Sequence, residues 1–403
     1  MKRSIAKGAV GSLAAILLIA GCSTTEAAVS EESTMSASET VVATEVAQSE
    51  EVTTTTVTAD SVLDVDWSQL PSTDVTLTDE GLTITDAGTY VLSGSSAGQV
   101  IVNSEGYVRI LLSGATITSS AGAAIQVDNA EGVAIETAEG TENSITDAAT
   151  RADEEIAGAI YSADDLLLTG SGTLNVTANF EDGIVGKDDL WIDSGTINVT
   201  SVDDGIRGTD SLNVSGGTIT INALGDGMKA SNSTDLGKGN LAITDGNITI
   251  TTGDDAIKAE QSLSIAGGTI NIVQSVEGIE APVIVIDGGD ITINASDDGI
   301  NASASDIITD GLSITINDGN LTINMGAGDT DAIDSNGDLT INGGTLTISA
   351  QSAFDYDGVG TLNGGTLIVN GEQVYELAQM MMGGPMDGGV GGDPGMMGGP
   401  GGM

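Results

Sequence analysis

The chain lacks histidine altogether, which excludes His-based catalytic triads, His-ligated zinc and the commonest general base. Any catalysis would depend on a carboxylate pair, lysine or arginine. A single cysteine, Cys22, excludes an internal disulfide. Two tryptophans, five tyrosines and two phenylalanines in 403 residues argue against a platform on which sugar rings stack.

Basic residues are also scarce, with 10 Lys and Arg against 59 Asp and Glu and a formal net charge of −49. Nucleic acid is excluded as a partner, because its binding is dominated by contacts from cationic side chains to phosphates. A surface this acidic suits neutral polymers, cations, or acidic polymers that cations bridge.

What the chain does have is a tripeptide of an acidic, a small and an apolar residue that returns every 21 to 22 residues. The copies begin at Asp204, Asp226, Asp255, Glu277, Asp298 and Asp331. A Gly-Gly pair before Thr or Asp keeps the same spacing, at Gly216, Gly267, Gly288, Gly343 and Gly364. Two signals with one period indicate a repeat architecture.

Each repeat holds short alternating apolar runs separated by Gly, Asp and Asn, without helical periodicity. Three short strands and three turns account for its length. We therefore predict an all-β, single-stranded parallel β-helix with one repeat per coil. Longer spacings at two coils predict loops that project around residues 231–239 and 303–311.

The ends of the chain differ from this pattern. Residues 1–21 carry basic residues, an apolar run and a small-residue site before Cys22, as in a bacterial lipoprotein signal. We expect Cys22 to carry lipid, residues 22–61 to form a Ser/Thr/Glu-rich linker, residues 62–371 to form the β-helix, and residues 372–403 to form a disordered Met/Gly-rich tail. The protein would then be a monomer tethered at the extracellular face of the bacterial membrane.

Equivalent positions of successive coils stack about 4.8 Å apart. The acids of the repeat would therefore form a column, here called the acidic ladder. Carboxylates this close repel one another unless they are protonated, paired or bridged by metal, and oxygen ligands suit Ca²⁺. The candidate calcium ligands are Asp182, Asp203, Asp204, Asp226, Asp254, Asp255, Glu277, Asp297 and Asp298. The alternative is ordinary turn chemistry of aspartate before glycine, facing water.

Three residues after each ladder acid lies a second column, here called the mixed column. Its members are Arg207, Lys229, Lys258, Glu280, Asn301 and Asp334, and Lys187 lies close by on the preceding coil. Two interpretations stay open. The basic residues pair with the ladder inside the protein, or they bind the carboxylates of an acidic sugar.

A third column of Thr and Asn follows the Gly-Gly pairs. It comprises Asn198, Thr220, Thr249, Asn271, Thr292, Thr322 and Thr347. Flat threonine arrays can bind ice or crystalline polysaccharide, but β-branched residues on a strand surface are also ordinary strand formers.

Several further segments are distinctive, among them Gly88-Thr89-Tyr90-Val91-Leu92-Ser93-Gly94, Gly98-Gln99-Val100-Ile101-Val102, Asp182-Gly183-Ile184 and Lys187-Asp188-Asp189-Leu190. Together they resemble a family of calcium-containing, cellulose- and pectin-binding β-helix lipoproteins of bacteria, the carbohydrate-binding domain-containing proteins. The resemblance runs from about residue 60 to 371. It implies a right-handed parallel β-helix similar to polysaccharide lyases, calcium bound by acidic residues, and cellulose or polygalacturonate as ligand.

The leading hypothesis is a non-catalytic, surface-tethered, calcium-dependent carbohydrate-binding protein with Arg207, Lys229, Lys258 and Lys187 as candidate carbohydrate-binding residues. The first alternative is a polysaccharide lyase that uses calcium and one of these basic residues as base. The second is a structural adhesin without a specific ligand.

Overall fold

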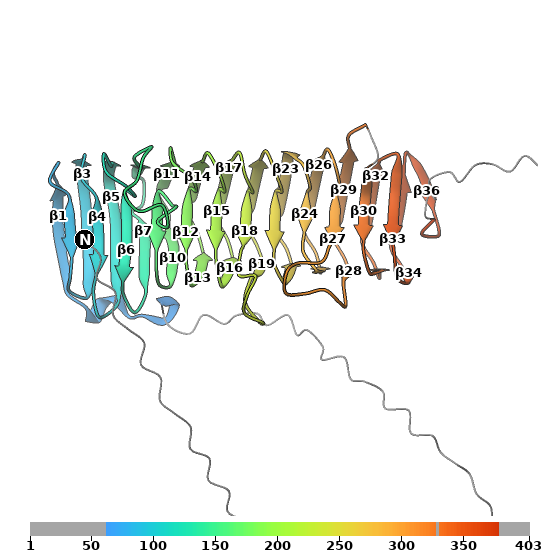
Figure 1. The fold of residues 1–403 in the computed structure, drawn as a ribbon, viewed down its shortest axis with the longest axis horizontal. Helices are drawn as coiled ribbons and strands as arrows, with labels where there is room; N and C mark the ends of the chain where they lie inside the picture. Colours follow the sequence, from blue (N-terminus) through green and yellow to red (C-terminus); the bar gives the residue numbers. More distant parts are fainter. Residues whose placement is uncertain (1–61, 328–329, 379–403) are drawn as a thin grey trace, which may run out of the picture. The chain divides into compact units, whose positions relative to one another are not determined.

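The computed structural model describes residues 62–327 and 330–378, and these form a solenoid of parallel strands (Figure 1). The predictions for residues 1–61, including Cys22, and for residues 379–403 lie outside the described part of the chain. Within it, no helix is long and apolar enough to cross a bilayer. Among residues 62–327 and 330–378, the only helical elements are two 3-10 turns, η1 (Val62–Asp64) and η2 (Trp67–Gln69).

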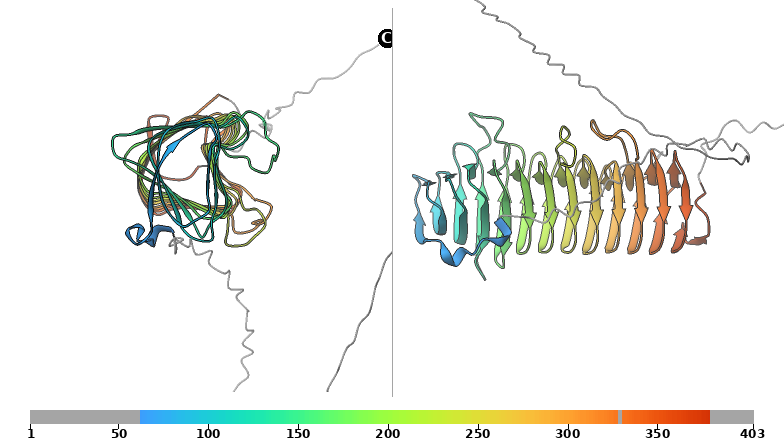
Figure 2. Two further views of the ribbon diagram at one scale, coloured as in Figure 1. Left: turned by 90° about the vertical axis from the view of Figure 1, so that its left-hand side faces the viewer. Right: turned by 90° about the horizontal axis from the view of Figure 1, so that it is seen from below.

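Three columns of strands make three faces of the solenoid, visible end-on in Figure 2. Face one comprises β7 (Val133–Thr137), β10 (Leu166–Gly170), β13 (Asp189–Ile192), β16 (Ser211–Val214), β19 (Asn240–Ile243), β22 (Ser262–Ile265), β25 (Val283–Ile286), β28 (Ser313–Ile316), β31 (Asp338–Ile341) and β34 (Gly360–Leu362). Face two comprises β8 (Glu142–Thr146), β11 (Thr173–Thr177), β14 (Thr196–Thr200), β17 (Thr218–Asn222), β20 (Asn247–Thr251), β23 (Thr269–Ser275), β26 (Asp290–Ala295), β29 (Asn320–Met325), β32 (Thr345–Ser349) and β35 (Thr366–Val369).

Face three is a separate sheet of 12 strands. It comprises β2 (Leu82–Ile84), β4 (Val100–Asn103), β6 (Ile125–Asn129), β9 (Ile160–Ser162), β12 (Ile184–Gly186), β15 (Ile206–Gly208), β18 (Met228–Ala230), β21 (Ile257–Ala259), β24 (Ile279–Glu280), β27 (Ile300–Ala302), β30 (Asp331–Ser335) and β33 (Ser352–Tyr356). Faces one and two merge near the N-terminal end, where the coils open with β1 (Ser72–Leu77), β3 (Gly88–Ser96) and β5 (Val108–Thr118). The long strand β5 pairs with both β7 and β8.

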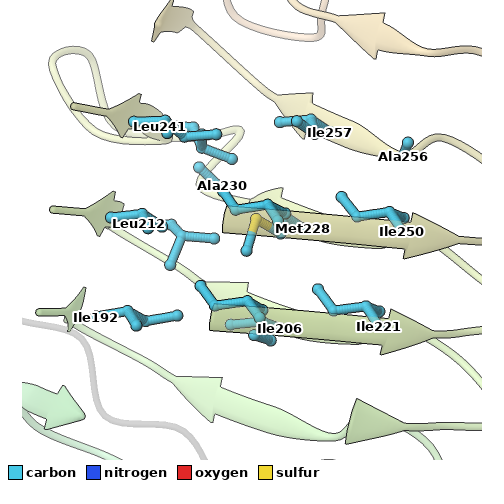
Figure 3. Packing of buried hydrophobic residues seen from close by; sticks show 14 of the residues in the cluster. Ile192, Ile206, Leu212, Ile221, Met228, Ala230, Leu241, Ile250, Ala256 and Ile257 are labelled. Atoms are coloured by element: carbon cyan, nitrogen blue, oxygen red, sulfur yellow. The ribbon is translucent and has the colours of Figure 1, made fainter. Parts of the chain in front are cut away.

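The predicted all-β parallel solenoid is confirmed, because the register joins equivalent residues of successive coils. Ile206 pairs with Met228, and Met228 pairs with Ile257. Their side chains are buried and stack on one another inside the solenoid, beside a parallel stack that contains Ile221 and Ile250 (Figure 3). Each such side chain contributes roughly 1.5–3 kcal/mol through burial. The alternation of the sequence is thus an alternation of inward and outward side chains.

The predicted projecting loops are also present. Residues 231–239 separate β18 from β19, and residues 303–312 separate β27 from β28, at the turn between faces three and one. A further insertion, residues 147–159, separates β8 from β9 at the turn between faces two and three. This insertion was not predicted.

The C-terminal boundary of the β-helix needs a correction, because the tail was predicted to begin at residue 372. Strand β36 (Glu372–Val374) pairs antiparallel with β35. Asn370 and Gly371 connect them with φ of 51° and 84°. An Asn-Gly pair with positive φ at both positions is the favoured two-residue hairpin turn. The hairpin covers part of the edge that the last coil would otherwise expose.

Candidate functional site

The acidic ladder lies where face two turns into face three, and Asp182 extends it by one coil toward the N-terminus. Its carboxylates accept hydrogen bonds from the backbone of the next coil. The N–H of Asp204 donates to Oδ1 of Asp182 at 3.1 Å, and the N–H of Asp226 donates to Oδ1 of Asp204 at 2.9 Å. Asp255 N–H continues the series onto Asp226 at 3.1 Å. These four side chains are buried. The ladder here is therefore part of the backbone hydrogen-bond system and does not face water.

Glycine follows Asp204 because the coils approach closely there. A Cβ atom on Gly205 would lie 2.5 Å from the carbonyl oxygen of Gly227 and 2.5 Å from the Ile221 side chain. This steric limit explains the glycine at this coil, whereas Ala256 and Ala332 occupy the equivalent position after Asp255 and Asp331.

The mixed column runs along the middle of face three. The register pairs Arg207 with Lys229 and Lys229 with Lys258, and then continues through Glu280, Asn301 and Asp334. Lys187 lies outside this column, because Val185 occupies the equivalent position of its coil. The side chain of Lys187 is exposed, and it makes no ion pair within 4.0 Å in the described part of the chain.

Each cation of the mixed column pairs with a ladder acid. Arg207 Nη2 lies 2.5 Å from Asp182 Oδ2. Lys229 Nζ lies 2.7 Å from Asp226 Oδ2 and 3.6 Å from Asp204 Oδ2. Burial disfavours the charge of Lys229, but Asp226 and Asp204 outweigh it and raise the pKa of this lysine above its usual value. This geometry favours intramolecular pairing over an anion-binding strip.

Lys258 is held in the same way. Its Nζ lies 2.7 Å from Asp255 Oδ2 and also contacts the carboxylate of Glu280 on the next coil. Burial opposes the charge, yet the two carboxylates raise the pKa of Lys258 strongly. A lysine in this state holds its proton and is poorly suited to act as a base.

The C-terminal part of the ladder has no such compensation, since Lys258 is the last basic residue of the chain. Burial raises the pKa of Glu277 to about 8, with Glu280 and Asp255 adding to the effect. Burial likewise raises the pKa of Asp334 to about 7, and the neighbouring acids Asp298, Asp331, Asp355 and Asp357 push in the same direction.

One buried amide faces these acids. Asn301 is 8% exposed, and its Nδ2 donates to Glu277 Oε2 at 3.1 Å. Its Oδ1 is buried without a hydrogen-bond partner among the described residues. Asn301 stands in the mixed column between Glu280 and Asp334. The donor set at this end of the ladder consists of carboxylate and amide oxygens, which is the ligand chemistry that Ca²⁺ prefers.

The acids form four groups of three residues. In each group, one carboxylate oxygen from every residue lies within 4.8 Å of the others. The groups are Asp182, Asp203 and Asp204; Asp226, Asp254 and Asp255; Asp255, Glu277 and Glu280; and Asp165, Asp188 and Asp189. Seven of the nine candidate ligands fall in these groups. Asp297 and Asp298 do not join such a group within residues 62–327 and 330–378.

The fourth group was not predicted. Its signal is a second acidic repeat, with Asp165 and Asp189 each lying at the start of a face-one strand one coil apart. Burial raises the pKa of Asp189, while the Ser211 hydroxyl, which donates to Oδ1 at 2.6 Å, opposes the shift.

The predicted Thr and Asn column is continuous on face two. The register joins Asn198 to Thr220, Thr220 to Thr249 and Thr249 to Asn271, and it continues to Thr347. It gives the outer surface of this face a row of hydroxyls and amides.

The chain is similar to known carbohydrate-binding domain-containing proteins. The family described as carbohydrate-binding domain-containing protein matches residues 78–329 and 274–365. A curated protein of Acetivibrio thermocellus with that description is 36% identical over 157 residues, which are 37% of this chain. This chain spans 55% of the length of that relative.

A solved structure, described as a polysaccharide lyase-like protein from C. thermocellum in a gadolinium derivative, is also similar. It shares 33% identity and a TM-score of 0.47, covering 54% of this chain and 92% of that chain. The family match extends over well more than half of the chain, and the protein therefore belongs to the carbohydrate-binding domain-containing family.

Proposed function

We propose that the protein is a non-catalytic, surface-tethered receptor for extracellular polysaccharide that depends on calcium. Membership of the carbohydrate-binding domain-containing family supports the ligand class. The observation that carries the non-catalytic assignment is the pairing of Arg207, Lys229 and Lys258, three of the four candidate bases, with buried carboxylates. The fourth, Lys187, lies outside the mixed column. A lyase needs a base with a lowered pKa beside the sugar, whereas the pKa values of Lys229 and Lys258 are raised.

Calcium would belong at the C-terminal half of the ladder rather than among the paired acids. Around Asp182, Asp204, Asp226 and Asp255, one arginine and two lysines already pair with the carboxylates, and a metal cation would have to compete with them. Around Asp334 and Asn301 the donors are oxygens and the chain supplies no basic residue. Asp334, with the Oδ1 of Asn301 and the carboxylate of Asp355 at the equivalent positions of the adjoining coils, would hold the ion. The ion would supply positive charge that offsets their repulsion and attracts an acidic polymer.

The polysaccharide would be cellulose or a pectin-like polyuronate. For a protein with a net charge of −49, an acidic polymer requires a bridging cation. The outer row of hydroxyls and amides on face two offers a neutral polymer a surface for hydrogen bonds.

A pull-down of the purified protein with insoluble cellulose and with polygalacturonate tests the proposal, with calcium and with chelator. We expect retention on at least one polymer, and calcium dependence on polygalacturonate. Time-dependent absorbance of unsaturated uronate in the same mixture would show a lyase and overturn the non-catalytic assignment. Absence of retention on a broad panel of polysaccharides would favour the adhesin alternative.

A further inference from the structure

Two projecting loops flank one short stretch of the solenoid surface. Loop 231–239 belongs to the coil of β18, and loop 303–312 belongs to the coil of β27. Both leave the lower edge of the solenoid in Figure 1, beside β19 and β28. β18 pairs with β21, β21 with β24, and β24 with β27, so three strand spacings, about 14 Å, separate the roots of the loops.

The coils between the loops make the same turn with very short segments. Only Glu260 and Gln261 lie between β21 and β22, and only Ala281 and Pro282 lie between β24 and β25. A cavity of about 330 Å³ lies here, at the root of loop 303–312. Its lining includes Lys258, Glu260, Glu280, Pro282, Ser303 and Asp306. This volume is within the range of small-ligand sites.

Hydrogen bonds fix the loop on the N-terminal side of this stretch. The N–H of Gly237 donates to Oε1 of Gln261 at 2.9 Å, and Nε2 of Gln261 donates to the carbonyl of Asp235 at 2.5 Å. Gln261 directly follows Glu260 of the cavity wall, and its side chain is buried. The loop is therefore anchored to the coil that carries Glu260.

The cavity wall on the C-terminal side is also ordered. The Ser303 hydroxyl donates to Oε1 of Glu280 at 2.5 Å. Within the loop, the Ser305 hydroxyl accepts from the N–H groups of Ile307 and Ile308 at 3.3 and 3.1 Å. Binding to a site held in place in this way costs little ordering entropy.

The charges of the lining indicate what it would accept. The amino group of Lys258 is shared between Asp255 and Glu280. The carboxylate of Glu260 makes no hydrogen bond or ion pair among the described residues, and it lies beside Glu280 and Asp306 in the lining. Acceptor groups are therefore in excess. Such a lining repels the carboxylate of a uronate, and it suits hydroxyl groups, which donate to carboxylates in charge-assisted hydrogen bonds.

We propose that this cavity is a subsite for one pyranose unit of a neutral polysaccharide, with Glu260 and Asp306 accepting hydrogen bonds from sugar hydroxyls. The lining contains no aromatic side chain, so recognition would rest on hydrogen bonds rather than on stacking. The inference rests on the proposed function and specifies where, and to which class of sugar, the protein binds.

Calorimetry with cellohexaose and with an oligogalacturonate of equal length tests this site in the full chain. We expect Glu260→Gln to weaken cellohexaose binding by about tenfold or more, the usual effect of losing a hydrogen bond to a charged group. Ala304→Trp, at an exposed lining position, would occlude the cavity with similar loss. Glu131→Gln, an exposed acid on a distant coil, is the matched control. Thermal melting of each variant checks the fold.

Three results would overturn the subsite. If the wild-type protein binds cellohexaose and both variants retain full affinity, sugar binds elsewhere and the proposed function stands. If Glu260→Gln removes a calcium-dependent rise in melting temperature and leaves sugar affinity unchanged, the cavity is a cation site. If the wild-type protein binds oligogalacturonate but not cellohexaose, only the neutral subsite fails, whereas failure to bind any polysaccharide in the pull-down rejects the proposed function as well.

Discussion

Lys258 Nζ lies 2.7 Å from Asp255 Oδ2, and the two residues belong to the same turn of the β-helix. Asp255 is buried, and its carboxylate in turn lies next to the acids of the neighbouring coils. The lysine therefore compensates a column of carboxylates that the stacking of coils forces together. Its role in stability can be separated from any role in ligand binding.

Replacing Lys258 by Met should lower the free energy of unfolding by about 2–3 kcal/mol. The change leaves Asp255 and Glu280 without their cation, and losing one partner of a buried pair costs about 3–5 kcal/mol. The lower value applies because the Lys258 side chain is 28% exposed. Lys238→Met is the control, since that side chain is 47% exposed and an exposed pair contributes about 1 kcal/mol or less. Equal losses in chemical denaturation would contradict the assigned role of the mixed column.

Stability should increase as the pH falls from about 8 to about 5 in the absence of calcium. The folded-state pKa values of Glu277 and Asp334 are raised to about 8 and about 7, so the folded protein binds more protons than the unfolded chain over this interval. Their favourable contribution is complete below the unfolded pKa values and is lost as the pH rises through the folded ones. Melting temperatures measured across this range test the sign. Asp334→Asn should flatten the curve and stabilise the protein at pH 8.

Calcium should raise the melting temperature, and the rise should depend on Asp334. A ligand at 100 times its dissociation constant adds about 2.7 kcal/mol to the stability of the state that binds it. Asp334→Asn should remove most of the calcium response. Asp310→Asn, which alters an exposed loop acid, should keep it. If chelator leaves the melting temperature of the wild-type protein unchanged, calcium does not occupy the ladder.

The fold could be predicted because one coil is one sequence repeat. The repeat spacing of Ile206, Met228 and Ile257 predicts that they stack on successive coils. The extra residues at 231–239 likewise predict a loop. The hairpin at Asn370 and Gly371 also carried a local signal, but it comes after the last regular repeat, and its second strand, Glu372–Val374, fell in the predicted tail.

The site was less predictable because the repeat fixes positions of residues but not the directions of side-chain atoms. The sequence placed Arg207 beside the acidic ladder, but only the geometry pairs its guanidinium with Asp182 on the preceding coil. Lys187 was predicted to lie close to Arg207 on the preceding coil, although the register gives the equivalent position to Val185. The cavity at Glu260 could not be predicted either, because its walls come from three different coils.

The insertion at residues 147–159 shows the same limit, because it occurs once and has no period. It carries Arg151, whose Nη2 lies 2.5 Å from Oδ2 of Asp147 and donates to the carbonyl of Gly158 at 3.0 Å. The guanidinium carbon lies 4.9 Å from the centre of the Phe180 ring. The side chains of Arg151 and Asp147 are 1% and 0% exposed. This pair fixes the insertion against the coil on which the ladder begins.

Arg151→Met should therefore destabilise the fold more than any change in the mixed column. We expect the free energy of unfolding to fall by about 3–5 kcal/mol, because the variant leaves a fully buried carboxylate without its cation. Burial already raises the pKa of Asp147 against the opposing hydrogen bonds of Asn179 and Arg151. Without the arginine the folded state should favour the protonated acid further, so the variant should regain stability on acidification. The double variant Asp147→Asn, Arg151→Met should recover much of the loss, because it removes the charge itself.

Arg109→Met is the control, since the Arg109 and Glu136 side chains are 24% and 30% exposed. Chemical denaturation at two pH values distinguishes these variants. If the double variant is as unstable as Arg151→Met, packing of the arginine side chain, rather than its charge, holds the insertion in place.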